Sequence, residues 1–164
     1  MTTQQVLRLS SPGSIASSQE AIPTPLPHEL LIKIHAVALN GRDIHVVDGT
    51  YALPVKDGVV MGSDCCGIVA GVGGEVEGRG FEVGDVVINA LNPMFLYGSL
   101  REEHGGETFG ALRDGVLREW MTIPASGAVK IPGRYMDGRG YEHWVSEGLV
   151  SVFFGCICLS SAVL

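Results

Sequence analysis

The sequence lacks any run of lysine or arginine. Its 11 basic residues are outnumbered by 18 acidic ones, which gives a formal net charge of −7. A protein without a basic patch cannot draw on attraction to phosphates, so nucleic-acid binding is not expected. The N-terminus, MTTQQVLRLSSPG, also lacks the apolar core of a secretion signal. We therefore expect a cytoplasmic protein that does not bind nucleic acid.

Cysteine is scarce, with four residues in two pairs: Cys65–Cys66 and Cys156–Cys158. Adjacent cysteines and a C-x-C pair do not match the usual zinc spacing of two to four intervening residues. In a reducing compartment these residues are expected to be buried, inert thiols. The cysteine pattern thus predicts neither a metal site nor a disulfide framework.

Glycine and apolar residues are plentiful. The 164 residues include 23 glycines and 8 prolines, and 46% of the chain is hydrophobic. Frequent glycine and proline indicate many turns between short strands. A short helix is expected at residues 40–48, because Asn40 can cap its start and Gly49 can end it. Strands are expected at residues 4–9, 29–39, 59–73, 83–90, 116–124 and 128–131, so the predicted fold class is mainly β, with one or two short helices.

The glycines at residues 71–74 suggest a dinucleotide-binding loop at first sight. Such a loop needs a strand before the glycines and a helix after them, so that the pyrophosphate meets the helix N-terminus. The following residues, EVEGRGFEVG, are rich in glycine and lack helical periodicity. A turn is the better interpretation, and no other segment offers a strand–glycine–helix unit.

Five polar or aromatic residues cluster around the predicted helix: Asn40, Arg42, Asp43, His45 and Tyr51. A histidine can transfer a proton near neutral pH, and a tyrosine can donate a hydrogen bond to a developing oxyanion. Surface residues beside a helix cap would show the same pattern, so both interpretations stay open. At residues 102–104, Glu-Glu-His could bind a metal, but a solvated loop is favoured, since neighbouring side chains rarely converge on one ion.

Four sequence blocks carry a resemblance to a known family. HELLIKIHAVALNGRDIHVVDGTY, VVMGSDCCGIVAGVGGEV, FEVGDVV and DGVLREWMTIP follow one another in the order and spacing of the medium-chain dehydrogenase/reductase family. They resemble its N-terminal, GroES-like catalytic domain over about residues 4–133. The resemblance implies a GroES-like irregular β-barrel at residues 1–133.

Two departures from the family pattern concern zinc. Zinc-dependent alcohol dehydrogenases have a cysteine at the position of Asn40, and Gly-His-Glu at the position of Gly62-Ser63-Asp64. Serine cannot replace histidine as a strong zinc ligand. The four closely spaced cysteines of a structural zinc lobe are also missing between Val86 and Cys156. The resemblance is therefore to the zinc-independent members, and no metal site is expected.

The resemblance also implies a function. Zinc-independent members pass hydride from a nicotinamide, usually NADPH, to a carbonyl, quinone or activated alkene. Their cleft is lined at the positions of Asn40, Asp43, His45 and Tyr51, with Arg42 between them. His45 departs from the tyrosine common at its position but can still donate a proton. The resemblance implies His45 and Tyr51 as catalytic residues and Asn40, Arg42 and Asp43 as cleft residues.

Residues 134–164 do not resemble the family's continuation, which is a helix followed by a nucleotide-binding Rossmann domain. Residues 148–164 are instead apolar and uncharged. We expect this segment to come from a truncated or misread gene product and the chain alone to be inactive, without bound NADPH. The alternative is a non-catalytic β-barrel that binds a partner or self-associates, with residues 148–164 as a short membrane anchor or a buried strand.

Overall fold

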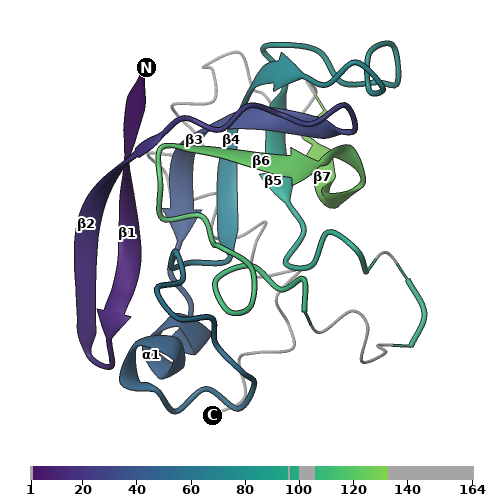
Figure 1. The fold of residues 1–164 in the computed structure, drawn as a ribbon. Coiled ribbons are helices and arrows are strands. Elements are labelled where there is room, and N and C mark those ends of the chain that lie inside the picture. Colours follow the sequence, from purple (N-terminus) through teal and green to yellow (C-terminus); the bar gives the residue numbers. More distant parts are fainter. Residues whose placement is uncertain (1, 96, 100–105, 133–164) are drawn as a thin grey trace.

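The computed structural model describes residues 2–95, 97–99 and 106–132. Strands dominate these residues, accompanied by one short α-helix and one 3-10 turn (Figure 1). The elements in chain order are β1 (Thr3–Ser11), β2 (Ser14–Ala21), β3 (Glu29–Ala38), α1 (Gly41–Asp48), β4 (Asp64–Val72), β5 (Val86–Asn89), β6 (Trp120–Pro124), η1 (Ala125–Gly127) and β7 (Ala128–Lys130). The mainly β class with one or two short helices is confirmed.

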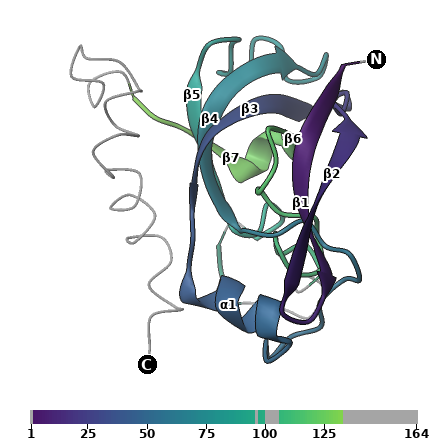
Figure 2. The ribbon, with the colours of Figure 1, turned by 90° about the vertical axis from the view of Figure 1, so that its left-hand side faces the viewer.

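A five-stranded antiparallel sheet forms the body of the domain, in the order β6-β3-β4-β5-β7. The sheet curls into a half-barrel, with α1 at its lower end (Figure 2). The curl is helped by irregular pairing of β3 with β4 at Ile34/Ala36. Next to this point, a side chain on Gly67 would collide with the carbonyl oxygen of Lys33, so only glycine lets the strands approach there.

The concave face of the sheet holds the main core. Alternate residues of β3 and β6 point inward because side chains on a strand alternate between faces. Phe109 comes from the long connection before β6 and is fully buried against the same cluster. The core consists of Leu30, Ile32, Cys65, Val69, Val76, Val87, Phe109, Val116, Met121, Ile123 and Ala128.

The strands β1 and β2 form a hairpin beside the sheet, around a turn at Pro12 and Gly13. Gly13 has φ 77°, the left-handed conformation that glycine adopts without strain. The strand at β1 was predicted, but residues 14–21 gave no specific strand signal. They are mostly small, polar and exposed. Pairing with β1, rather than a buried face, is what makes β2 a strand.

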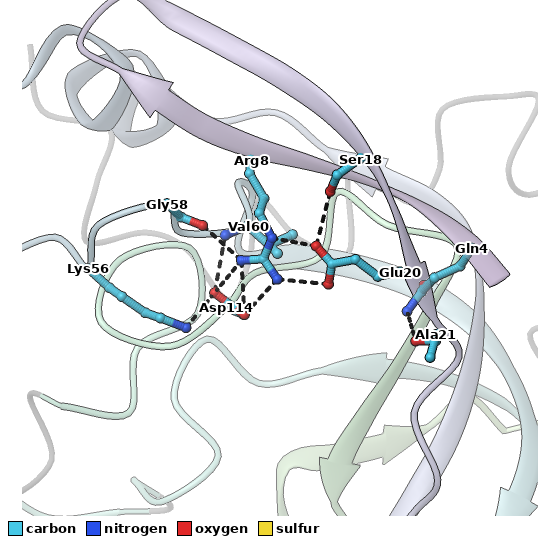
Figure 3. A network of polar contacts seen from close by, with 9 residues as sticks. All are labelled: Gln4, Arg8, Ser18, Glu20, Ala21, Lys56, Gly58, Val60 and Asp114. Atoms are coloured by element: carbon cyan, nitrogen blue, oxygen red, sulfur yellow. Dashed lines mark hydrogen bonds and ion pairs between the residues drawn. The ribbon is translucent and has the colours of Figure 1, made fainter.

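An ion cluster fastens this hairpin to the domain (Figure 3). We call Arg8, Glu20, Lys56 and Asp114 the hairpin ion cluster. Arg8 donates to both carboxylates, and Lys56 Nζ lies 3.0 Å from Asp114 Oδ1. Burial alone would raise the pKa of Asp114, but hydrogen bonds from Lys56 and the backbone N–H of Val60, with the charge of Arg8, hold it below its ordinary value. The cluster is therefore fully paired.

The described residues that connect β4 to β5 and β5 to β6 are irregular. The glycines at residues 71–74 end β4 and lead into a turn at residues 74–80 instead of a helix, which confirms the turn interpretation. Between β5 and β6, residues 92–95, 97–99 and 106–115 contain neither helix nor named strand. In the part of the chain that the structure describes, no helix is long and apolar enough to cross a membrane. The segment 148–164 lies outside the described residues.

Candidate functional site

The candidate residues gather where β3 ends and α1 begins. Asn40 has an extended conformation (φ −117°, ψ 159°), and the chain turns into the helix at Gly41. The backbone N–H of Asn40 donates to Asp43 Oδ2 at 2.8 Å, which closes the first turn. Gly49, with φ 74°, ends the helix. The predicted helix and both of its predicted boundaries are confirmed.

A second set of contacts joins Asn40 to the start of β4. Its side-chain amide Nδ2 donates to Asp64 Oδ2 at 2.7 Å, and the hydroxyl of Ser63 donates to the same oxygen. Ala38 and Asp64 are paired in the sheet, so the strand register brings these segments together. We call Asn40, Ser63 and Asp64 the Asn40 cluster. The two segments whose sequence departs from the zinc pattern are thus in direct contact.

Asn89, which was not among the predicted residues, fixes the position of this cluster. Its Oδ1 accepts from the backbone N–H of Cys65 at 2.7 Å, and its Nδ2 donates to the carbonyl of Ser63 at 2.8 Å. Asn89 is buried at the end of the otherwise apolar strand β5. A polar residue in such a strand was the signal that could have revealed it, because buried amides are nearly always hydrogen-bonded.

Asp43 is buried, with 7% of its surface exposed, and its Oδ1 has no hydrogen-bond partner in the described part of the chain. Burial raises the pKa of this carboxyl group, although the N–H of Asn40 and the charge of Arg42 oppose the shift. A buried carboxylate with one unpartnered oxygen is unfavourable. The protonated form of Asp43 is therefore favoured relative to an exposed aspartate.

Arg42 is equally buried, at 6% exposed. Its Nη1 donates to the carbonyl of Phe109 at 2.9 Å, and its guanidinium carbon lies 5.1 Å from the centre of the Tyr51 ring. Its Nε and Nη2 find no hydrogen-bond partner among the described residues. The structure thus brings Arg42 and Tyr51 together and adds Phe109, whose position in an irregular loop gave no sequence signal.

His45 lies apart from these groups. It is exposed in the last turn of α1, and its Nδ1 is 2.9 Å from the Thr50 hydroxyl. Tyr51 is half-buried and lines a cavity of about 380 Å³ with Val46, Leu53 and residues of the β1–β2 turn. His45 lines neither this cavity nor a second one, which lies along α1 on the side of Asn40 and Asp43. Of these two cavities beside α1, neither is therefore lined by both residues implied as catalytic.

A groove of about 440 Å³ lies along α1 on the side of Asn40 and Asp43. Most of its other wall residues are apolar, and they come from the β1–β2 hairpin, α1 and the segment before β4. We call it the α1 groove. It is lined by Ile15, Leu39, Asn40, Gly41, Asp43, Ile44, Val47, Asp48 and Met61.

The described thiols are inert by environment, as predicted. Cys65 and Cys66 are both buried and free. Burial raises the pKa of the Cys65 thiol far above its usual range and that of Cys66 to about 11. Within the described ranges, no three His, Cys, Asp or Glu side chains are grouped so that they could hold a metal ion. The segment at residues 102–104, Cys156 and Cys158 lie outside those ranges.

Residues 26–133 match the model of the alcohol dehydrogenase GroES-like domain. The chain belongs to the medium-chain dehydrogenase/reductase family. Members of this family are oxidoreductases, and the GroES-like fold that the four sequence blocks implied is confirmed.

Curated relatives of this medium-chain dehydrogenase/reductase domain are much longer than the chain. A zinc-type alcohol dehydrogenase-like protein of Schizosaccharomyces pombe is 38% identical over 106 residues, which is 65% of this chain and 30% of the relative. An L-threonine 3-dehydrogenase of Deinococcus radiodurans is 32% identical over 144 residues, 81% of this chain and 40% of the relative. The chain thus spans about a third of the length of these relatives.

Solved structures of the family agree with the fold. A protein of Sinorhizobium meliloti described as a zinc-binding dehydrogenase, with bound NADP, has a TM-score of 0.66 and 28% identity, covering 80% of this chain and 39% of its own. A thermostable alcohol dehydrogenase of Pyrobaculum aerophilum has a TM-score of 0.66 and 26% identity, covering 79% and 41%. The chain therefore covers about two fifths of each of these two structures.

Proposed function

We propose that the chain carries the catalytic-type domain, residues 1–133, of a zinc-independent oxidoreductase. In its complete form such an enzyme reduces a carbonyl, quinone or activated alkene with NADPH. The observation that carries this proposal is the Asn40 cluster, in which an amide and a hydroxyl both donate to the Asp64 carboxylate. This cluster fills the positions where the zinc-dependent relatives of the resemblance have a cysteine and a histidine.

The residues present do not fit a zinc ion. Zinc in proteins is held by thiolate, imidazole and carboxylate groups in a tetrahedral arrangement. Here Asn40 and Ser63 supply a neutral amide and a hydroxyl, and both already donate hydrogen bonds to the Asp64 carboxylate. The neighbouring Cys65 thiol is buried in the core beside Met121, with a raised pKa. The reaction proposed for this domain therefore involves no metal ion.

The described residues also do not fit the pyrophosphate of NADPH. The glycines at residues 71–74 lead into a turn, so they offer no helix N-terminus for phosphate. We propose that NADPH belongs to a separate nucleotide-binding domain of the complete enzyme, where it would supply the hydride. Support comes from the greater length of the relatives and from the NADP bound to the Sinorhizobium meliloti protein. Residues 1–164 alone are then inactive.

We propose that some of the chain's own residues position the site and that others contact substrate or exchange protons. Asn40 and Asp43 hold the first turn of α1 in place, and Arg42 fixes Tyr51 beside it. Tyr51 lines a cavity and can donate a hydrogen bond to a substrate oxygen. His45 is exposed and can exchange a proton with solvent through its contact with Thr50. These roles are specific enough to be tested one residue at a time.

Localisation and partners follow from the same proposal. Two free thiols in the described core suit a reducing compartment, so we place the protein in the cytoplasm. In the complete enzyme its partner is then a small-molecule substrate. A second candidate, a non-catalytic binding β-barrel, is favoured by the exposed apolar side chains of Leu39 and Ile44 beside α1.

Titration of NADPH fluorescence against the pure chain tests the proposal. We expect no saturable binding, and we expect turnover only when a nucleotide-binding domain of the family is joined after residue 133. In that fusion, Tyr51→Phe and His45→Ala should each lower the rate. Micromolar NADPH binding by residues 1–164 would contradict our assignment of the cofactor. A folded fusion that binds NADPH but reduces no carbonyl, quinone or alkene would favour the non-catalytic barrel.

A further inference from the structure

The α1 groove brings several exposed apolar side chains together in one concave site. Leu39 is 74% exposed and Ile44 63% exposed, and both line the groove together with Ile15 from the hairpin. Single exposed apolar side chains are ordinary on protein surfaces. Several that share one concave site are instead typical of a surface that another group covers.

The chain itself contains a segment of matching chemistry. Residues 148–164, GLVSVFFGCICLSSAVL, include no acidic or basic side chain. The groove carries only acidic charge, from Asp43 and Asp48, in a chain of net charge −7. An uncharged segment avoids electrostatic repulsion by these two carboxylates. Removing both apolar surfaces from water at once is favourable.

The segment has enough chain to reach the groove. The described part ends at Pro132, just after β7, and the 15 residues from 133 to 147 precede the apolar segment. Fully extended, they span about 50 Å. A domain of this length has a radius of gyration of only about 14 Å. Every face of the domain therefore lies within reach.

We propose that residues 148–164 dock into the α1 groove of the same chain and cover Asn40 and Asp43. The other cavity beside α1 is a poorer fit, because Ser10, Lys56 and Asp57 contribute polar groups to its wall. Docking in the α1 groove places the segment against the candidate cleft residues. The docked segment would then cover the apolar side of α1, which is the surface that a non-catalytic binding β-barrel would use to contact a partner. The proposal does not depend on the proposed reaction.

Photo-crosslinking in the full chain tests the identity of the occupant. A benzoylphenylalanine at Ile44 is compared with one at Val83, which is similarly exposed at 68% but lies in the turn before β5, outside the groove. We expect Ile44 to crosslink within one chain to a peptide from residues 148–164, with a yield independent of dilution, and Val83 not to. Crosslinks between two chains that fade on dilution, or no crosslink from Ile44, would overturn the proposal.

The segment's own cysteines provide a second readout. A docked segment shields Cys156 and Cys158 from a thiol reagent, whereas Cys65 and Cys66 are buried in the domain. Ile44→Lys places a charge in the groove at an exposed position, where the fold is not at risk. We expect it to speed labelling of Cys156 and Cys158 several-fold, and Val83→Lys to leave the rate unchanged. Equal labelling rates in both variants, or protection only when lipid vesicles are added, would refute docking.

Discussion

The hairpin ion cluster and the first turn of α1 differ in how their charged side chains are buried and paired. In the ion cluster, Arg8 and Asp114 are partly exposed and every charge is paired. In α1, Arg42 and Asp43 are almost fully buried, and each has side-chain polar atoms without a hydrogen-bond partner among the residues that the structure describes. Paired charges stabilise a fold, whereas buried unpaired ones cost stability. The comparison indicates that the ion cluster stabilises the fold. The buried, incompletely paired charges of α1 lower the stability of the folded domain next to the candidate site.

The largest expected effect is the loss of Asp114. Asp114→Ala removes the acceptor for Arg8, Lys56 and the N–H of Val60 at once, so the hairpin loses an ion-paired link to the domain. We expect a loss of about 2 kcal/mol in the free energy of unfolding at neutral pH. Urea denaturation measures it. Because the folded pKa of Asp114 is lowered, the stabilisation should fade as the pH falls below the ordinary aspartate range. A loss that does not shrink in acid would contradict this pairing.

Asp43→Asn should have a smaller effect of opposite sign. The amide oxygen can still accept from the N–H of Asn40, and the buried charge disappears. The folded pKa of Asp43 is raised, so the favourable contribution of its protonated form is complete at low pH and is lost as the pH rises through the folded pKa. We expect the variant to gain up to about 1 kcal/mol relative to the wild type between acid and neutral pH. A variant that is less stable at neutral pH than in acid, relative to the wild type, would show that the carboxylate is paired.

His45→Ala should change stability less, by under about 0.5 kcal/mol, since exposed side chains away from special features have small effects. Tyr51→Phe is its matched partner, because it keeps the ring beside Arg42 and removes only the hydroxyl. Thermal unfolding of both variants separates a role in function from a role in the fold. A large loss of stability in either would make it unsuitable as a probe of the site.

Local patterns in the sequence predicted the elements that depend on local signals. Asn40 and Gly49 marked the helix, and the apolar residues 29–39 marked β3. The hairpin was only half predicted, because β2 is exposed and its partners, not its own residues, make it a strand. The links from Arg8 to Asp114 and from Arg42 to Phe109 span 106 and 67 positions. No local pattern reports such contacts.

The candidate site shows the same limit. The resemblance singled out Asn40 and Gly62-Ser63-Asp64 separately, and the register of β3 with β4 explains why they meet. Asn89 was missed although a polar residue in an apolar strand is a usable signal. His45 and Tyr51 were grouped by closeness in sequence, but the end of α1 turns them toward different surroundings. Their catalytic roles stay predictions.

The smallest expected effect is that of removing metal, and it bears on the Asn40 cluster. The hydrogen bonds within this cluster join Asn40 and Ser63 to the Asp64 carboxylate and leave no role for a metal ion. Dialysis against EDTA should therefore leave the melting temperature unchanged. A structural zinc would behave differently, because its binding energy is part of the folding energy. Elemental analysis of the dialysed chain provides the independent measurement. Zinc retained at one ion per chain, and lost in Asn40→Ala, would show that the cluster rearranges around a metal and would return the chain to the zinc-dependent branch. If EDTA has no effect while Asn40→Ala lowers the melting temperature, Asn40 acts through its hydrogen bonds alone.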